Sequence, residues 1–312
     1  MKDKDDKQTR PISTIEKAMQ RLKSSADETK QATKPERPSS DAVVQTIPSN
    51  KITKSEATNI NRHANYCELD FNELNRKGFL TPDIMNESLR EEYRVIKRPL
   101  LNNMRGKSVA PIEHGNLLVV TSAMPGEGKT YNSLNLAMSF SMEHDTHVLL
   151  IDSDVIKPSL TAILGLTDVP GLTDMLSGNV EHMSDILYKT SIPKLNVIPA
   201  GRHYAHDTEL LSSDKMKRLT DELAIRYSDR IVMFDAPPML ATSHARVMAQ
   251  YAGQIVMIVE AGKTLDYSIK DAISHIGNDK VVGIILNKGR GAFGTSYYGS
   301  YGTYGANAQK SD

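Results

Sequence analysis

Short, continuous apolar runs recur through the middle of the chain and alternate with longer amphipathic stretches such as Ser212–Ser228. The runs are Leu117–Thr121, Val148–Asp152, Leu195–Pro199, Ile231–Asp235, Ile255–Val259 and Val282–Leu286. Strands without polar alternation are covered on both faces, and strands separated by helices join through right-handed crossovers. The pattern therefore predicts an α/β domain with a doubly wound, mostly parallel sheet.

Residues 1–60 lack such runs and are rich in Lys, Asp, Ser, Thr and Pro. Segments of this composition bury too little apolar surface to offset the entropy of ordering, so we expect most of this extension to be disordered. One exception is residues 12–24, where apolar side chains recur at helical spacing. They are Ile12, Ile15, Met19 and Leu22. This short amphipathic helix is either transient in water or folds on a partner.

Residues 61–110 are expected to form a helical lead-in to the main domain. Within it, the stretch ESLREEYRVIKRPLLNNM carries its apolar side chains on one side of a predicted helix. They are Leu89, Tyr93, Ile96 and Leu100. The main domain then occupies residues 111–290, and residues 291–312 form a flexible tail rich in glycine and tyrosine.

The composition indicates where in the cell the protein works and which kinds of partner it lacks. The formal net charge is +0, so bulk charge gives no argument for binding nucleic acid. The single cysteine, Cys67, excludes an intramolecular disulfide framework and a multi-cysteine metal site. No apolar run approaches the roughly 18 residues of a spanning helix, and MKDKDDKQTR lacks the apolar core of a signal peptide. We therefore expect a cytoplasmic protein that meets a membrane only through a partner.

The sharpest motif is AMPGEGKT at residues 123–130, between an apolar run and an amphipathic stretch. It is a Walker A loop with alanine in the first position. Gly126 and Gly128 let the backbone amides turn inward, and the following helix directs its positive end at the phosphates. Lys129 is expected to contact the β- and γ-phosphates, and the Thr130 hydroxyl to bind Mg²⁺. The predicted nucleotide contacts are Pro125, Gly126, Glu127, Gly128, Lys129, Thr130 and Tyr131.

Carboxylates follow two further predicted strands. Asp152 and Asp154 come at the end of the second strand, and Asp235 ends the fourth. In an open α/β sheet these strand ends line the ligand crevice. We expect Asp152 and Asp235 to join Thr130 in binding Mg²⁺, and the pair Asp152 and Asp154 to act with Lys129 in catalysis, one of its two carboxylates approaching the incoming hydroxyl.

Single polar residues after strands have simpler interpretations as well. An aspartate in that position often caps a helix. Asn287, which ends the last predicted strand, is either a hydrogen-bonding partner of adenine or an ordinary turn residue.

The segment GTSYYGSYGTYG at residues 294–305 holds four of the 12 tyrosines and neither charge nor aliphatic side chains. Glycine at this density disfavours a helix. Alone, the segment is typical of a disordered terminus. Beside a Walker A loop and three strand-end aspartates it predicts a phosphate-accepting tail. The expected acceptors are Tyr297, Tyr298, Tyr301 and Tyr304.

Together these motifs resemble the bacterial tyrosine kinases, or BY-kinases, of polysaccharide synthesis and export. The resemblance covers Leu89 to Tyr304, about two-thirds of the chain. It rests on AMPGEGKT, on VLLIDSDVIKP as the paired-aspartate Walker motif, on IVMFDAPP as Walker B, on TELLSSDKM and on the tyrosine-rich tail. EEYRVIKRPLL resembles the E-x-x-R-x-x-R helix that packs subunits of the family into a ring. Glu91, Arg94 and Lys97 occupy its three positions.

Three positions depart from the family pattern. Ile156 stands where the first of two basic residues is usual, and RHYAHDTELL replaces a proline-rich helix start. Lys97 replaces an arginine and cannot form a bidentate fork, so the ring contact is weaker or uses Arg98 instead.

The resemblance implies a P-loop kinase domain that uses ATP and Mg²⁺ as a non-specific protein-tyrosine kinase. Its substrate would include the tail of a neighbouring subunit, and its role would be to regulate exopolysaccharide synthesis, chain length or export. The segments PISTIEKAMQRL and KRPLL resemble the subgroup associated with exosortase and PEP-CTERM loci. That likeness implies a separate cytoplasmic chain, recruited to the inner face of the plasma membrane by a chain-length-determinant (polysaccharide co-polymerase) protein. The family resemblance as a whole implies a ring-type homo-oligomer and a cognate tyrosine phosphatase, and from the net charge we expect no nucleic-acid partner.

Two alternatives stay open. A partition- or site-selection-type ATPase of the same broad fold would hydrolyse ATP to drive dimerisation on a surface. Met124, where that class has its second lysine, and the tyrosine tail argue against it. A nucleotide-gated scaffold of a polysaccharide export complex would bind nucleotide without phosphotransfer, and the altered DSDVIKP sequence is compatible with that role.

Overall fold

The computed structural model describes residues 65–82, 86–108, 110–204, 207–227 and 229–289. All of them belong to residues 61–312, the second of two units into which the chain divides. The helix expected at residues 12–24 lies outside the described residues. So do the four expected acceptors, Tyr297, Tyr298, Tyr301 and Tyr304.

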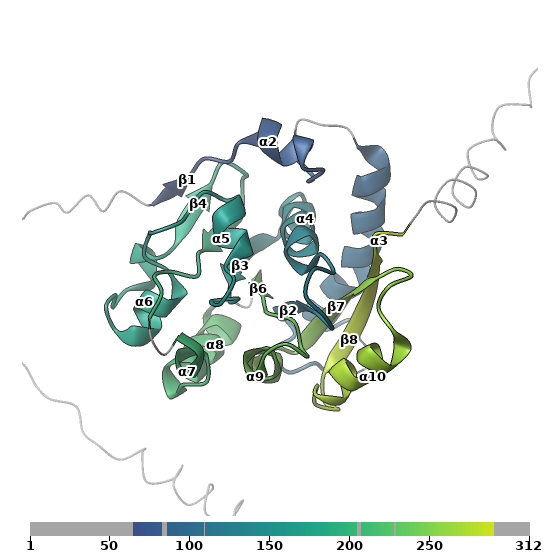
Figure 1. Ribbon diagram of the computed structural model, residues 1–312. Helices are drawn as coiled ribbons and strands as arrows, with labels where there is room; N and C mark the ends of the chain where they lie inside the picture. The colour runs from purple at the N-terminus through teal and green to yellow at the C-terminus, as the bar shows by residue number, and fades with distance from the viewer. Residues whose placement is uncertain (1–64, 83–85, 109, 205–206, 228, 290–312) are drawn as a thin grey trace, which may run out of the picture. The chain divides into compact units, whose positions relative to one another are not determined.

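An eight-stranded sheet lies at the centre of the described part of the chain (Figure 1). Its order is β1-β4-β5-β3-β6-β2-β7-β8, and each neighbouring pair is parallel except β4 and β5. The strands are β1 (Tyr66–Cys67), β2 (Leu117–Ser122), β3 (His147–Asp152), β4 (Tyr188–Thr190), β5 (Leu195–Ile198), β6 (Arg230–Asp235), β7 (Gln254–Glu260) and β8 (Val281–Asn287). The predicted doubly wound, mostly parallel α/β fold is confirmed.

The six apolar runs of the sequence correspond to β2, β3, β5, β6, β7 and β8. The strands β1 and β4 were not predicted. They contain two and three residues, too few to show a periodicity of their own. They extend the sheet beyond β5 and do not reach the strand ends that carry the predicted site.

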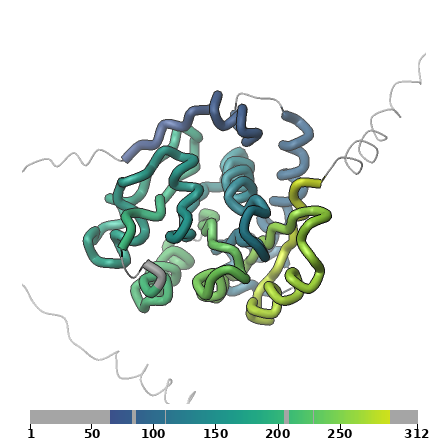
Figure 2. The backbone as a smooth tube through the Cα atoms, in the orientation of Figure 1, coloured from purple at the N-terminus to yellow at the C-terminus, as the bar shows by residue number. Residues whose placement is uncertain are grey.

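Alternate side chains of the central strands enter two separate cores. In β2, Leu118 and Val120 belong to one core, and Leu117 and Val119 to the other. The first core is bordered by α2 (Phe71–Arg76), α3 (Glu87–Met104), α4 (Lys129–Ser141) and α5 (Ser159–Ile163). The second is bordered by α6 (Leu172–Ser177), the 3₁₀ turn η2 (Met183–Asp185), α7 (Asp207–Leu211), α8 (Asp214–Arg226), α9 (Ser243–Tyr251) and α10 (Asp266–Ser274). Helices thus lie on both sides of the sheet (Figure 2), which is why the inner strands read as continuous apolar runs. The edge strand β8 is an exception, because Ile284 and Leu286 are exposed although its sequence is equally apolar.

Helix α3 forms where the sequence predicts it. Asn86 caps its first turn, because its side-chain oxygen accepts a hydrogen bond from the Leu89 amide at 3.1 Å. Tyr93, Leu100 and Leu101 are buried against the domain. Glu91 and Arg94 lie on the outer side and form an exposed ion pair at 2.5 Å.

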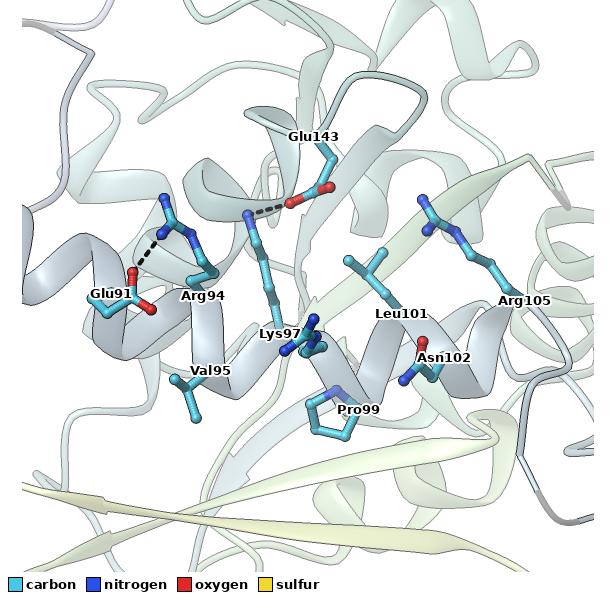
Figure 3. A pocket seen from close by; sticks show the side chains of 10 residues that line it. Glu91, Arg94, Val95, Lys97, Pro99, Leu101, Asn102, Arg105 and Glu143 are labelled. Carbon is cyan, nitrogen blue, oxygen red and sulfur yellow. Dashed lines mark hydrogen bonds and ion pairs between the residues drawn. The ribbon is translucent and has the colours of Figure 1, made fainter. Parts of the chain in front are cut away.

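Lys97, the third position of the predicted ring motif, points into the protein (Figure 3). It is only 6% exposed, and its Nζ donates to the Ser139 carbonyl at 2.7 Å and pairs with Glu143 at 2.7 Å. Ser139 lies near the end of α4, where a positive charge also interacts favourably with the helix dipole. The structure therefore brings Glu91 and Arg94 to the surface, whereas Lys97 fastens α3 to α4.

A hollow lies beside α3, and charged side chains line much of it (Figure 3). Arg94, Arg98 and Arg105 contribute basic groups, and Glu91 and Glu143 contribute acidic ones. Charges of both signs from α3 and from the segment after α4 thus gather in this hollow, which suits contact with a complementary charged surface.

Lys97→Met is expected to lower the free energy of unfolding by about 1–3 kcal/mol. The substitution keeps most of the aliphatic stem and removes both charge-assisted hydrogen bonds, so the loss reports on the internal contacts of Lys97. Urea unfolding at neutral pH measures it. Equal stability of the variant and the parent chain would contradict the internal role.

The pH dependence of that stabilisation follows from Glu143. The hydrogen bond from Lys97, opposed by partial burial, lowers the pKa of the Glu143 carboxyl. Its stabilising effect is therefore present above the ordinary carboxyl pKa and is lost as pH falls through the lowered value. Glu143→Gln should be less stable than the parent chain at about pH 7, and urea unfolding should show this difference shrinking as pH falls below the ordinary carboxyl pKa.

Candidate active site

The predicted phosphate loop connects β2 to α4 and contains two glycines with positive φ. Gly126 has φ of 86° and Gly128 has φ of 97°, a conformation that residues with a Cβ rarely adopt. A Cβ on Gly128 would also lie 2.1 Å from the amide nitrogen of Asn287. Because Gly128 is the N-cap of α4, the loop presents the positive end of that helix to a bound anion.

Three successive carbonyls of this loop each accept a hydrogen bond from a side chain. Lys288 Nζ donates to Gly126 O at 2.7 Å, and Asn287 Nδ2 donates to Glu127 O at 2.8 Å. Asn132 Nδ2 donates to Gly128 O at 2.9 Å. These three hydrogen bonds hold the backbone of the loop, whose amides are the groups that would bind an anion.

Glu127 supports the loop from inside. Its side chain is 3% exposed, and one carboxylate oxygen accepts from the Met124 amide at 2.9 Å. The other accepts from the Thr264 hydroxyl, in the connection between β7 and α10. Glu127 was predicted as a nucleotide contact, and the structure leaves its backbone on the loop while its carboxylate faces inward.

Tyr131 shows a similar division. Its hydroxyl donates to the Gly78 carbonyl at 2.7 Å, and its ring centroid lies 5.0 Å from that of Phe79. The side chain therefore packs on the segment after α2, and only the backbone of Tyr131 belongs to the first turn of α4.

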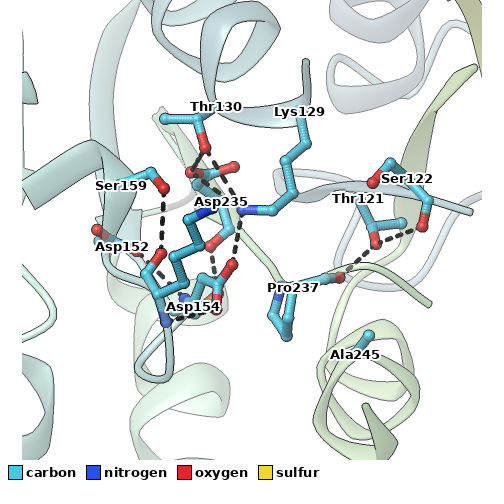
Figure 4. Close-up of polar contacts among 12 residues, drawn as sticks. Thr121, Ser122, Lys129, Thr130, Asp152, Asp154, Ser159, Asp235, Pro237 and Ala245 are labelled. Carbon is cyan, nitrogen blue, oxygen red and sulfur yellow. Dashed lines mark hydrogen bonds and ion pairs between the residues drawn. The ribbon is translucent and has the colours of Figure 1, made fainter. Parts of the chain in front are cut away.

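A compact cluster of charges joins the phosphate loop to the carboxyl ends of β3 and β6 (Figure 4). Lys129 Nζ lies 2.8 Å from Asp154 Oδ2 and 3.8 Å from Asp235 Oδ2. Burial opposes the charged form of Lys129, but the carboxylates of Asp235 and Asp154 outweigh it and raise the pKa of the ammonium. A positively charged lysine is thus held between two acids beside the loop.

Asp235 is completely buried and accepts two side-chain hydrogen bonds from α4. Thr130 Oγ1 donates to its Oδ2 at 2.7 Å, and Ser133 Oγ donates to its Oδ1 at 2.9 Å. Burial raises the pKa of Asp235, while Lys129 and the two hydroxyls act in the opposite direction. Ser133 was not among the predicted residues, although it lies one helical turn beyond Lys129.

The paired aspartates contact different partners. Asp152 Oδ2 accepts from both the amide and the hydroxyl of Thr161, each at 2.8 Å. Asp154 instead contacts Lys129 and accepts from the Lys157 amide at 3.1 Å. Burial and the nearby charge of Asp235 raise the pKa of Asp152 to about 7. Of the two, Asp154 is the carboxylate in direct contact with the predicted catalytic lysine.

The predicted magnesium ligands lie at the adjoining ends of β3 and β6. Asp152 and Asp235 occupy paired register positions and Thr130 contacts Asp235, although one oxygen of Asp152 already accepts two hydrogen bonds from Thr161. Among the described residues, no group of three or more His, Cys, Asp or Glu could hold a metal. Oxygen donors beside a buried carboxylate fit Mg²⁺, which commonly takes one or two protein ligands and completes its shell with phosphate and water.

Asn287→Ala is expected to raise the KM for ATP about tenfold by removing the donor that holds the Glu127 carbonyl. Because this contact involves the loop and no base, the KM for GTP should rise by the same factor. Steady-state kinetics with both nucleotides measure the two changes. A loss confined to ATP would instead support direct contact of Asn287 with adenine.

No helix of the described segments is both long and apolar enough to cross a membrane.

Known proteins are similar to this chain in sequence and in fold. A family model described as an AAA domain matches residues 116–276, which include the phosphate loop and all three aspartates. The tyrosine-protein kinase YwqD of Bacillus subtilis (strain 168) is 33% identical over 215 residues, which are 68% of this chain and 86% of YwqD. The tyrosine-protein kinase CpsD of Streptococcus agalactiae is 30% identical over 201 residues, which are 64% of this chain and 85% of CpsD.

A solved structure gives the same result. The crystal structure of the VpsO kinase domain matches with a TM-score of 0.54 and 29% identity, over 64% of this chain and 96% of that domain. The likeness therefore extends over nearly the whole of a separately folded kinase domain.

Proposed function

This chain belongs to the bacterial tyrosine-protein kinases, and from that premise we propose that it transfers the γ-phosphoryl group of ATP to tyrosines of its own tail segment, residues 294–305, on a neighbouring subunit. The observation that carries the proposal is the position of Lys129 between Asp154 and Asp235, with Thr130 bonded to Asp235. These groups meet beside a loop shaped for phosphate, where phosphoryl transfer requires positive charge and an acceptor for the phenolic proton.

Lys129 and Asp154 can act in successive steps of phosphoryl transfer. When nucleotide occupies the loop, the Lys129 ammonium can exchange its carboxylate partner for phosphate oxygens. The Asp154 Oδ2 that Lys129 engages at 2.8 Å is then released to accept the proton of the tyrosine hydroxyl. A bond forms between the phenolic oxygen and the γ-phosphorus, and the bond from that phosphorus to the bridging oxygen of ADP breaks.

Thr130 and Asp235 would hold Mg²⁺, which when bound neutralises charge on the phosphates. Their burial supports this assignment, because a carboxylate with no access to solvent favours a cation partner. Asp152 would stabilise the site by accepting hydrogen bonds from the amide and hydroxyl of Thr161.

The wider role follows the same premise. We propose that the protein is cytoplasmic and forms a ring-type homo-oligomer through Glu91 and Arg94, whose exposure on α3 supports an intermolecular contact. It would act in exopolysaccharide synthesis with a membrane chain-length-determinant protein and a cognate tyrosine phosphatase. The PISTIEKAMQRL and KRPLL segments support the PEP-CTERM-associated subgroup.

Incubation of the purified chain with Mg·ATP, with and without a cytoplasmic segment of such a partner, tests the function. Mass spectrometry should find phosphotyrosine among Tyr297, Tyr298, Tyr301 and Tyr304. Consumption of ATP without protein-bound phosphate would support an ATPase, and nucleotide binding without either reaction would support a scaffold.

A further inference from the structure

Helix α3 is connected to the phosphate loop by two consecutive side-chain hydrogen bonds. The Tyr93 hydroxyl donates to Asn132 Oδ1 at 2.9 Å, and Asn132 Nδ2 donates to Gly128 O at 2.9 Å. Tyr93 and Asn132 are each 3% exposed, so water cannot readily replace either contact. The surface helix with Glu91 and Arg94 is thus two bonds away from the N-cap of α4.

The direction of both bonds is fixed by chemistry. The Gly128 carbonyl can only accept, so the Asn132 amide must present its nitrogen to the loop. Its oxygen then faces Tyr93, whose hydroxyl must donate. Burial raises the pKa of Tyr93 and keeps that donor protonated. Removing the hydroxyl would leave the buried Asn132 oxygen without its donor and free the amide to turn away from Gly128.

Asn132 holds the Gly128 carbonyl in two ways. Its carbonyl receives the Asn132 side chain at 2.9 Å and the Asn132 backbone amide at 3.0 Å. A displacement of Asn132 would therefore also move Gly128, which is the N-cap of α4 and directly precedes Lys129.

We propose that Tyr93 and Asn132 are positioning residues that connect the seating of α3 on α4 to the conformation of the phosphate loop. This inference rests on the proposed nucleotide site. Because coupling between two sites is reciprocal, nucleotide in the loop should also tighten the seating of α3, and with it the surface that carries Glu91 and Arg94. Subunit assembly and nucleotide affinity would then depend on each other through the buried side-chain amide of Asn132.

Fluorescence titration of the full chain with Mg²⁺ and N-methylanthraniloyl-ADP tests the proposal. Tyr93→Phe and Asn132→Ala should each bind about tenfold more weakly than the parent chain. The double variant should bind no more weakly than Asn132→Ala alone, because Tyr93 acts through Asn132. Tyr251→Phe is the matched control, since it removes a hydroxyl bonded to the Leu211 carbonyl at 3.3 Å on the opposite side of the sheet.

Hydrogen exchange of the α3 amides distinguishes coupling from a purely structural role, because only coupling makes the exchange rate depend on bound nucleotide. Mg·ADP should slow exchange of the α3 amides in the parent chain and in Tyr251→Phe, but not in Tyr93→Phe. Additive losses of affinity, or equal protection of α3 in Tyr93→Phe, would overturn the proposal. Failure of the parent chain itself to bind nucleotide would instead reject the proposed function.

Discussion

Replacement of Lys129 by methionine should reduce phosphotyrosine formation on the order of 10³-fold or more. Methionine has a similar length and no charge, so it removes the group expected to stabilise the transferring phosphoryl. It also leaves Asp154 without the ammonium that lies 2.8 Å away, next to the buried Asp235. Unpaired acids at that position would repel the phosphates instead of receiving them.

Phosphosite mapping after incubation with Mg·ATP measures the effect. Lys77→Met is the matched control, because Lys77 is half-exposed and pairs at 2.6 Å with Glu73 on the surface. It should retain the activity of the parent chain. Comparable activity in Lys129→Met would show that the charge at this position does not act in transfer.

Local sequence was sufficient for the loop and for most of the sheet. A Walker A loop consists of consecutive residues, so its motif can be recognised directly in the sequence. Its glycines are needed because the local backbone takes positive φ, such as 97° at Gly128. The buried strands were visible because helices cover both faces of the sheet. The edge pair β1 and β4 escaped prediction, since pairing between short segments far apart in the chain leaves no periodic signal.

The supports of the site could not be found in the same way. Thr264 and Lys288 reach the loop from sequence positions more than a hundred residues away. Only the adjacency of Lys288 to Asn287 gave any signal. Spacing also could not tell that Asp152 would bond to Thr161 while Asp154 met Lys129. Nor could it tell that Lys97 would turn inward, because its partner Glu143 lies just beyond the end of α4.

Mixing two inactive chains should restore tyrosine phosphorylation. One chain carries Lys129→Met and keeps its tail, and the other keeps Lys129 and has phenylalanine at all four tail tyrosines. The first should lack phosphotransfer and the second should lack acceptors. Together they should give phosphotyrosine on the Lys129→Met chain roughly tenfold or more above either alone, if an oligomer presents the tail of one subunit to another at high effective concentration.

Transfer within one chain is the competing route, and the described geometry makes it a serious one. Lys288 donates to the Gly126 carbonyl at 2.7 Å, so the last described residues before the tail lie beside the phosphate loop of their own subunit. The eight residue-to-residue steps from Gly289 to Tyr297 can span about 27 Å, enough to return to that crevice. If transfer occurs within one chain, the mixture of the two variants should form no phosphotyrosine. The rate per molecule of the parent chain should then be independent of its concentration. Transfer between subunits requires assembly, so the rate per molecule should fall on dilution and on replacement of Arg94 by alanine, which removes an exposed charge of α3 without touching the Lys129 cluster.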